Sequence, residues 1–255
     1  MSGNPYSEPV STDTVPQSGK LLLWGCGGIV GLIGIGILLL FLLLPFSRGR
    51  GARGASRRLQ CKNNLKHIAL ALHNYHDVHD AFPPAFTVDE NGNRLHSWRT
   101  LILPYIEQQA LYKQIDLAKP WDDPANQSAY ETNILTYRCP AADVAPFHAT
   151  YLGLVGPDLF FNSSESRQIR DIKDGTSNTL MVVEVAQHQS VHWMSPEDVD
   201  EGFFTNIAEQ TDFSHTHGFQ AALADGSVRY LSKDIAAETL DALTTVAGGE
   251  VIGEY

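Results

Sequence analysis

Three histidines recur at every third residue of the stretch ALALHNYHDVHDAFPP (69–84): His73, His76 and His79. On an α-helix, His73, His76 and Asp77 share one face because they lie three and four residues apart. Imidazole and carboxylate groups bind zinc, so these three residues are weak candidates for a metal site. The H-E-x-x-H spacing of many zinc enzymes is absent. We therefore favour a polar helix end whose histidines form hydrogen bonds, and we expect no cofactor.

A second pair of chemically capable residues is His215 and Asp225, with Ser214 beside the histidine. Hydrolytic catalysis would need a nucleophile, a base and an orienting group that converge in a cleft, and this spacing does not predict such a cleft. Asp225-Gly226 is typical of a turn, because Gly adopts positive φ and Asp bonds to the nearby backbone. We expect His215 to bond to that turn or to a neighbouring strand, and we expect no enzymatic activity.

An amphipathic helix positions the first histidines. Apolar residues recur at three- and four-residue spacing at Leu59, Leu65, Ile68, Leu72 and Tyr75. Phe82-Pro83-Pro84 ends this helix, since proline cannot continue it and restricts the preceding residue. Shorter helices are expected at 97–115, with a break at Pro104, and at 234–250. Residues 116–133 are polar and predict an irregular loop.

Short strands account for most of the remaining chain. Runs rich in apolar or β-branched residues predict strands at 134–140, 150–156, 178–186 and 218–232. Asn-Gly within 88–93 predicts a tight turn, and Asp225-Gly226 predicts a hairpin. Asp174-Gly175 also favours a turn over a calcium loop, which needs a denser alternation of Asp ligands. No strand–helix–strand alternation occurs, so the expected class is α+β with an antiparallel sheet.

The N-terminal part of the chain contains a long uncharged segment, Leu21 to Phe46. A helix of about 20 apolar residues spans a bilayer, so we predict one permanent transmembrane helix at 20–46 after a disordered polar tail at 1–19. The segment fits a cleaved signal peptide badly, because no cleavage site with small residues follows it. Gly27 and Gly31 form a GxxxG pair, which predicts self-association in the membrane.

Charge is distributed unevenly along the chain. Residues 1–79 contain 8 Lys and Arg against 3 Asp and Glu, a net charge of +5, and residues 80–255 contain 10 against 26, a net charge of −16. The acidic body excludes nucleic acid as a partner, because phosphate contacts need clustered basic residues. A basic linker at 47–57 follows the membrane segment and can contact anionic lipid head groups. By the positive-inside rule, these arginines would place the body in the cytoplasm.

Several motifs occur together in a fixed order. They are RRLQCKNNLKHIALALHNYHDVHDAFPPAF (57–86), LILPYIEQQALY (101–112), YRCP (137–140), DIKDGTSNTLMVVE (171–184), His215 followed after nine residues by Asp225-Gly226, and AGGEVI (247–252). This combination resembles the bacterial prepilin-like family called domain of unknown function 1559. The family-motif residues are Asn63, Asn64, His73, Tyr75, Pro83, Pro84, Asp174, Gly175, His215, Asp225 and Gly226.

The resemblance implies a pilin- or pseudopilin-like architecture. Such proteins have a long N-terminal helix that spans the membrane, continues as an amphipathic helix and packs on an antiparallel sheet; here that domain would be 58–255. This chain departs from the pattern, because its membrane segment lacks the prepilin cleavage signal and a glutamate near its start. The expected protein is therefore a permanently anchored relative.

The same resemblance implies that Cys61 and Cys139 pair. Such a bond would link the helix to the sheet. By restricting the unfolded chain, it would raise the free energy of unfolding by about 3–4 kcal/mol. It requires an oxidising compartment, whereas a cytoplasmic body would hold two reduced thiols. The resemblance places the body in the periplasm, against the arginines at the flank, and we follow the resemblance.

Two functions from different classes fit these features. The first is a non-enzymatic, single-pass inner-membrane protein that acts through protein–protein contacts in the cell envelope. The alternative is an extracytoplasmic sensor module that binds a ligand or a metal. A pocket that held His73, His76 and a carboxylate of the body would favour the second. The sequence names neither the partner nor the ligand, and it does not predict whether a fibre forms.

Overall fold

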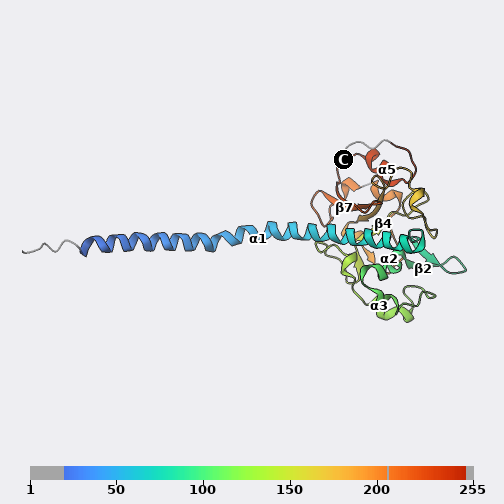
Figure 1. Cartoon of the computed structure of the whole chain (residues 1–255), viewed down its shortest axis with the longest axis horizontal. Coiled ribbons are helices and arrows are strands. Elements are labelled where there is room, and N and C mark those ends of the chain that lie inside the picture. The colour runs from blue at the N-terminus through green and yellow to red at the C-terminus, as the bar shows by residue number, and fades with distance from the viewer. Residues whose placement is uncertain (1–19, 206, 251–255) are drawn as a thin grey trace, which may run out of the picture. The chain divides into compact units, whose positions relative to one another are not determined.

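The computed structural model describes residues 20–205 and 207–250, and it describes side chains at 34–37, 39, 53–205 and 207–250. The chain divides into two compact units, which meet between Ala52 and Arg53. The polar tail predicted at 1–19 lies outside the described residues. The second unit, the body, contains the sheets, the short helices and the C-terminal part of helix α1 (Figure 1).

Helix α1 comprises Lys20–His79. No helix in the described part of the chain is both long and apolar enough to cross a membrane. Most side chains of the predicted transmembrane segment, 20–46, lie outside that part, as do Gly27 and Gly31 of the GxxxG pair. The transmembrane helix therefore stays a prediction.

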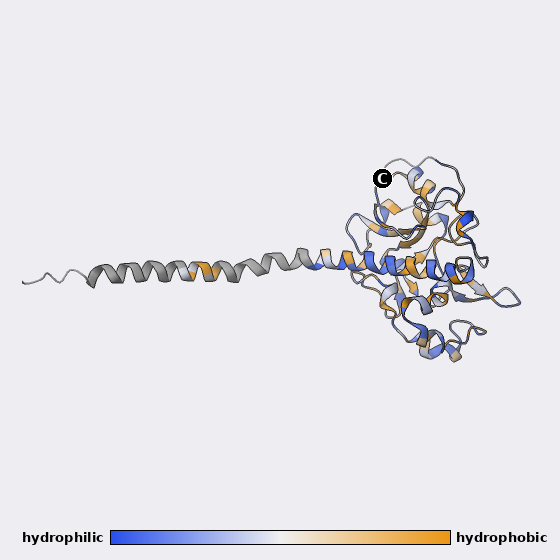
Figure 2. Cartoon of the chain, viewed as in Figure 1, coloured by the Kyte–Doolittle hydropathy of each residue, from blue (hydrophilic) through white to orange (hydrophobic). Residues whose placement is uncertain are grey.

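Within the body, one face of α1 is apolar and buried, as the spacing predicts. Leu65, Ile68 and Leu72 have no exposed surface, whereas Leu70 on the opposite face is 59% exposed. Figure 2 shows the resulting mixture of polar and apolar positions along this part of the helix. Leu59 was expected in the buried stripe, but it is 63% exposed, and the buried positions of the helix begin at Cys61.

The body contains a four-stranded antiparallel sheet with the order β4-β5-β7-β8. Its strands are β4 (Tyr151–Gly153), β5 (Leu180–Glu184), β7 (Gly218–Leu223) and β8 (Val228–Ser232). The predicted hairpin is confirmed, since β7 and β8 flank a turn in which Gly226 has a φ of 81°. Two-stranded antiparallel sheets join β1 (Phe86–Val88) to β2 (Arg94–Ser97) and β3 (His148–Ala149) to β6 (Val191–His192). The α+β class is confirmed.

Short helices connect these strands. They are α2 (Trp98–Leu101), α3 (Gln109–Tyr112), α4 (Gln127–Tyr130) and α5 (Ala237–Thr244), with 3₁₀ turns η1 (Leu103–Ile106), η2 (Pro124–Asn126), η3 (Leu135–Tyr137), η4 (Ile169–Asp171), η5 (Gln187–Gln189), η6 (Glu201–Phe204) and η7 (Ile207–Glu209). The short helices expected at 97–115 are α2 and α3, and α2 ends before Pro104. Pro104 lies near the start of η1, where its missing N–H costs no hydrogen bond. The loop predicted at 116–133 contains η2 and α4.

The strand predicted at 134–140 is wrong, because this segment forms η3. Tyr137 N donates to Ile134 O, which closes a tight turn instead of pairing with a strand. The amide of Asn64 on α1 donates to Leu135 O and Arg138 O at 3.2 and 3.0 Å. Backbone carbonyls that a strand would have paired are therefore satisfied from the helix.

Strands β4, β5 and β7 of the four-stranded sheet are buried on both faces. Side chains alternate along β5, so that Val182 packs in the core with α1 and Val183 packs in a second core with α5. On β7, Ala222 packs in the core with α1, and Phe219 packs in the core with α5. The sheet is therefore the middle layer of the body, and polar groups on its α1 face are enclosed.

Candidate functional site

Four buried side chains with metal-ligating atoms meet between α1 and the sheet. They are Cys61, Cys139, Glu184 and His215, which we call the Cys–His–Glu cluster. Their ligand atoms all lie within 4.8 Å of one another, and all four residues are buried. Among the described residues, no other group of three or more His, Cys, Asp or Glu side chains brings its ligand atoms this close. The cluster is therefore the first candidate site of the body.

The two cysteines form a disulfide bond, which confirms the predicted pair. Their Cα atoms are 5.1 Å apart, and their sequence separation is 78. Cys61 begins the buried face of α1, and Cys139 follows η3. Cys139 N donates to Thr150 Oγ1 at 2.8 Å, which fixes the second half of the bond beside β4. The disulfide thus joins α1 to the loop that leads into the sheet.

Glu184 ends β5 and its side chain is fully buried. Its Oε2 accepts a hydrogen bond from Gln220 N at 3.1 Å, whereas its Oε1 has no hydrogen-bond partner. Burial raises the pKa of Glu184 to about 7, and the N–H of Gln220 and the side chain of Ser214 act in the opposite direction. The carboxyl group therefore lacks full compensation for its loss of water.

His215 lies just before β7, where it forms an antiparallel bridge with Gly218. Its Nε2 lies 3.5 Å from Cys139 Sγ and 3.6 Å from Glu184 Oε1. Burial lowers the pKa of His215 to about 4, with a smaller contribution from Arg58. His215 and Glu184 lie at ion-pair distance, and burial shifts both pKa values towards the neutral forms.

The histidine repeat of α1 does not converge on a common point. His73 Nε2 donates to Ala224 O at 2.9 Å, and His76 Nε2 accepts from Ile169 N at 3.4 Å. His79 stacks on Tyr75 with ring centroids 4.1 Å apart. Asp77 is exposed. In the described part of the chain these residues belong to no metal-binding group, and each histidine instead has its own neighbour.

The two Asp-Gly turns differ in what contacts them. The histidine beside Asp225-Gly226 is His73, through Ala224 O. Of the two contacts expected for His215, the structure shows the one to a neighbouring strand, at Glu184 of β5. Asp174 accepts hydrogen bonds from Gly248 N at 2.7 Å and Gly249 N at 2.9 Å. Its carboxylate therefore holds the C-terminal glycine pair, as a turn anchor would.

The remaining family-motif residues occupy structural positions. Asn63 is exposed, but Asn64 is only 7% exposed and bonds to the segment before Cys139. Pro83 is buried and Pro84 is half-buried where the chain leaves α1. Gly175 has a φ of 94°, which only glycine adopts readily.

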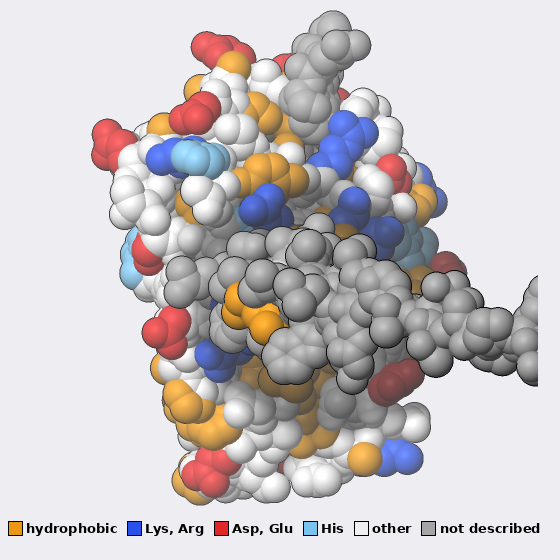
Figure 3. Space-filling model, turned by 90° about the vertical axis from the view of Figure 1, so that its left-hand side faces the viewer, with side chains coloured by type: hydrophobic (Ala, Val, Ile, Leu, Met, Phe, Trp, Pro, Cys, Tyr) orange, Lys and Arg blue, Asp and Glu red, His pale blue; other side chains and the backbone are white. Residues whose placement is uncertain are grey.

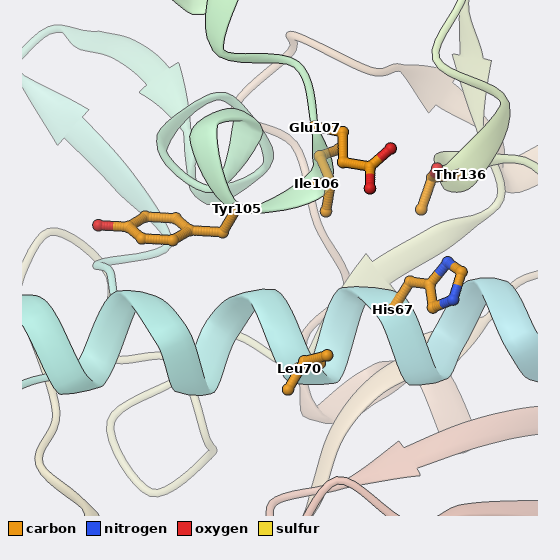
Figure 4. Close-up of a pocket in the computed structure, with 6 residues that line it drawn as sticks. All are labelled: His67, Leu70, Tyr105, Ile106, Glu107 and Thr136. Carbon is orange, nitrogen blue, oxygen red and sulfur yellow. The ribbon is translucent and has the colours of Figure 1, made fainter.

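A separate cavity of about 280 Å³ lies beside the outer face of α1. Its lining residues are His67, Leu70, Tyr105, Ile106, Glu107 and Thr136. Figure 4 shows Ile106 and Glu107 directed towards α1, and His67 rising from the helix on the side of Thr136. Glu107 has a φ of 64°, unusual for a residue other than glycine. The sequence did not reveal this cavity, because three distant segments form it.

The comparison with known families gives one match. The family described as "Protein of unknown function (DUF1559)" matches residues 50–155 and 147–214. The matched part includes Cys61, Cys139 and Glu184, and it ends one residue before His215. No curated protein matches the chain, and no solved structure matches it.

Proposed function

The chain belongs to the DUF1559 family of proteins of unknown function, and on that premise we propose that it is a non-enzymatic, single-pass protein of the cell inner membrane. In this proposal residues 20–46 form the membrane anchor. The body lies in the periplasm and acts through protein–protein contacts in the envelope, in the manner of a pilin or pseudopilin that is not released from its anchor.

The observation that carries this proposal is the Cys61–Cys139 disulfide. Disulfides persist in oxidising compartments and are rare in the cytoplasm. The bond therefore supports a periplasmic body, against the orientation that the arginines after the membrane segment favour. The packing of α1 on an antiparallel sheet supports the pilin-like part of the proposal.

Membrane lipid is the second proposed contact. Arg53, Arg57 and Arg58 are all exposed on α1 at the start of the body. Figure 3 shows Lys and Arg side chains towards the middle of one face of the body and Asp and Glu mostly towards its edge. A basic group close to anionic head groups gains about 1 kcal/mol per Lys or Arg. These arginines can thus serve lipid contact whichever side of the membrane the body occupies.

Self-association through Gly27 and Gly31 belongs to the same proposal. A Gly27→Leu and Gly31→Leu double variant should lose membrane oligomers that the wild type forms, because leucine keeps the two helices apart. Crosslinking of both proteins in membranes measures this. Unchanged oligomers in the double variant would remove the GxxxG face from the proposal.

Topology is the direct test of the main proposal. A reporter enzyme that is active only outside the cytoplasm is fused after Tyr255, and Cys61 and Cys139 peptides are mapped without reduction. We expect reporter activity and a linked pair of peptides. An inactive reporter together with free thiols would overturn the periplasmic assignment and leave a cytoplasmic scaffold or sensor.

A sensor module that binds a ligand or a metal is the second candidate function. The histidine repeat does not favour it, since those side chains have separate neighbours. The Cys–His–Glu cluster favours it, because four potential ligands from four segments meet in one buried place.

A further inference from the structure

We propose that the Cys–His–Glu cluster, when its disulfide is reduced, is a closed zinc site. The ligands are the thiolates of Cys61 and Cys139, Nε2 of His215 and one carboxylate oxygen of Glu184. Zinc binding and the disulfide then exclude each other, so the cluster has two covalent states. This inference does not rest on the proposed membrane function, and each can fail without the other.

The spacing of the ligand atoms matches a tetrahedral site. Zinc bonds of about 2.0–2.3 Å place the ligands of a tetrahedron about 3.3–3.8 Å apart. His215 Nε2 already lies 3.5 Å from Cys139 Sγ and 3.6 Å from Glu184 Oε1. The two sulfur atoms must separate to about 3.8 Å once their bond is broken, and the remaining ligand atoms lie within 4.8 Å of one another.

The unpaired oxygen of Glu184 points to a missing cation. Glu184 is fully buried, and its Oε1 has no hydrogen-bond partner, although His215 Nε2 lies 3.6 Å away. The neighbouring Ser214 Oγ is also without a partner, and its hydroxyl lowers the pKa of Glu184 against the effect of burial. A buried acceptor without a partner costs about 1–3 kcal/mol. A disulfide alone requires neither a carboxylate nor an imidazole next to it, so a purely structural bond leaves both groups unexplained. A zinc ion would satisfy both.

Neighbouring groups hold the ligands in place. Gln220 N donates to Glu184 Oε2, which leaves Oε1 free to face the sulfur atoms. Thr150 Oγ1 accepts from Cys139 N, and Asn64 bonds the carbonyls just before Cys139. Such partners orient metal ligands in known sites. Because four protein groups complete the coordination and all are buried, the site would be structural and not catalytic.

The two states are connected by thiol–disulfide exchange with an external dithiol. One thiolate of the dithiol attacks a cysteine sulfur and forms a mixed disulfide; its second thiolate then displaces that cysteine. Cys61 and Cys139 gain two electrons and two protons, and the dithiol is oxidised to its disulfide. Zinc then binds both sulfurs as thiolates, and their two protons pass to solvent.

Cobalt binding by the full chain in detergent tests the site. The protein is reduced with a phosphine, which does not supply competing thiols, and titrated with Co²⁺ and then with Zn²⁺. We expect one Co²⁺ per chain with the visible bands of a tetrahedral ion and a thiolate charge-transfer band, both removed by Zn²⁺. The oxidised protein should show neither band. Absence of both bands in the reduced, folded protein would overturn the proposal.

Matched variants assign the ligands. Glu184→Gln keeps the shape of the side chain and an acceptor for Gln220, and His215→Gln removes the imidazole. Each should weaken zinc binding at least about 100-fold, because even the mutation of residues that only hydrogen-bond to metal ligands lowers metal affinity 10–100-fold. His73→Gln is the control and should bind as the wild type does. Wild-type affinity in both ligand variants would overturn the assignment.

X-ray absorption on the zinc-loaded wild type covers the case in which a variant does not fold. We expect two sulfur and two nitrogen or oxygen atoms around zinc. A shell without sulfur would place the metal elsewhere and overturn the proposal. Zinc should also prevent an oxidised dithiol from re-forming the Cys61–Cys139 bond. If the bond re-formed equally fast at saturating zinc, zinc binding and the disulfide would not exclude each other.

Discussion

Asn63 and Asn64 are adjacent in the sequence, but only Asn64 is buried. Comparing them tests how much the hydrogen bonds of the buried side chain contribute to stability. Asn64 Nδ2 donates to Leu135 O and Arg138 O, whereas Asn63 is exposed. Asn64→Ala leaves two carbonyls near the disulfide without a partner, so we expect a loss of about 2 kcal/mol in the free energy of unfolding. Asn63→Ala should change it by less than about 0.5 kcal/mol. Urea unfolding of the full chain in detergent, followed by tryptophan fluorescence, measures both, and equal losses would contradict the assigned role.

His192 has a fixed protonation state because both ring nitrogens have partners. Its Nε2 donates to Tyr130 O at 3.1 Å, and its Nδ1 accepts from Met194 N at 3.2 Å. The ring also stacks on Tyr130, with centroids 4.0 Å apart. This pattern requires neutral imidazole, because a protonated Nδ1 cannot accept. Burial lowers the pKa of His192 to about 4, and the nearby His148 and Arg99 act in the same direction.

This shift predicts a loss of stability in mild acid. The unfolded chain binds the proton of His192 near its ordinary pKa of 6.5, whereas the folded chain binds it only near 4. Protons therefore favour the unfolded state as the pH falls from 6.5 to 4. We expect His192→Gln to show a smaller fall in the free energy of unfolding across this window than the wild type. His215 has the same sign of shift and Glu184 the opposite sign, so the contribution of His192 is the difference between the two curves. Parallel curves for the two proteins would refute the role of His192.

Single-residue roles were predictable only where they depend on local sequence. The turns at Asp174-Gly175 and Asp225-Gly226 follow from the residues themselves, since Gly adopts positive φ. The meeting of Glu184 with His215 and the cysteines depends on strand order and on the enclosed face of the sheet, which no local pattern contains. The sequence contains one indication that Glu184 is buried, namely a charged residue at the end of an otherwise apolar strand.

Helix α1 is the element whose packing the spacing predicts best, and it allows a matched comparison. Leu72 has no exposed surface, whereas Leu70 is 59% exposed. Leu72→Ala should lower the free energy of unfolding by about 3 kcal/mol, through lost burial and the cavity that remains. Leu70→Ala should change it by less than about 0.5 kcal/mol. The same urea unfolding experiment compares them, and a large effect at Leu70 would mean that this face is covered in the full chain.

Other elements were predictable where their residues agree with their partners. The strands at 150–156 and 178–186 and the 218–232 hairpin were found from β-branched runs and an Asp-Gly turn. The segment 134–140 has similar residues, yet it forms η3 because Asn64 and a tight turn satisfy its backbone. Tertiary hydrogen bonds thus override local strand preference there.

At the scale of the whole body, α1 and α5 cover opposite faces of one sheet, and the Cys61–Cys139 bond joins α1 to the rest. The bond closes a long loop, with a sequence separation of 78 between its ends. In the chain-entropy model, such a loop raises the free energy of the unfolded state by about 4 kcal/mol. The disulfide therefore stabilises the body mainly by reducing the number of conformations available to the unfolded chain.

A double variant separates this effect from the buried side chains around it. Cys61→Ala with Cys139→Ala should lower the free energy of unfolding by about 4 kcal/mol relative to the oxidised wild type, because the unfolded chain regains its freedom. The reduced wild type with a metal chelator is the control and should approach the stability of the double variant, since neither contains a link. Urea unfolding of the full chain in detergent measures all three proteins. If the double variant were as stable as the oxidised wild type, the disulfide would not restrain the unfolded chain, and the attachment of α1 would depend on its apolar face alone.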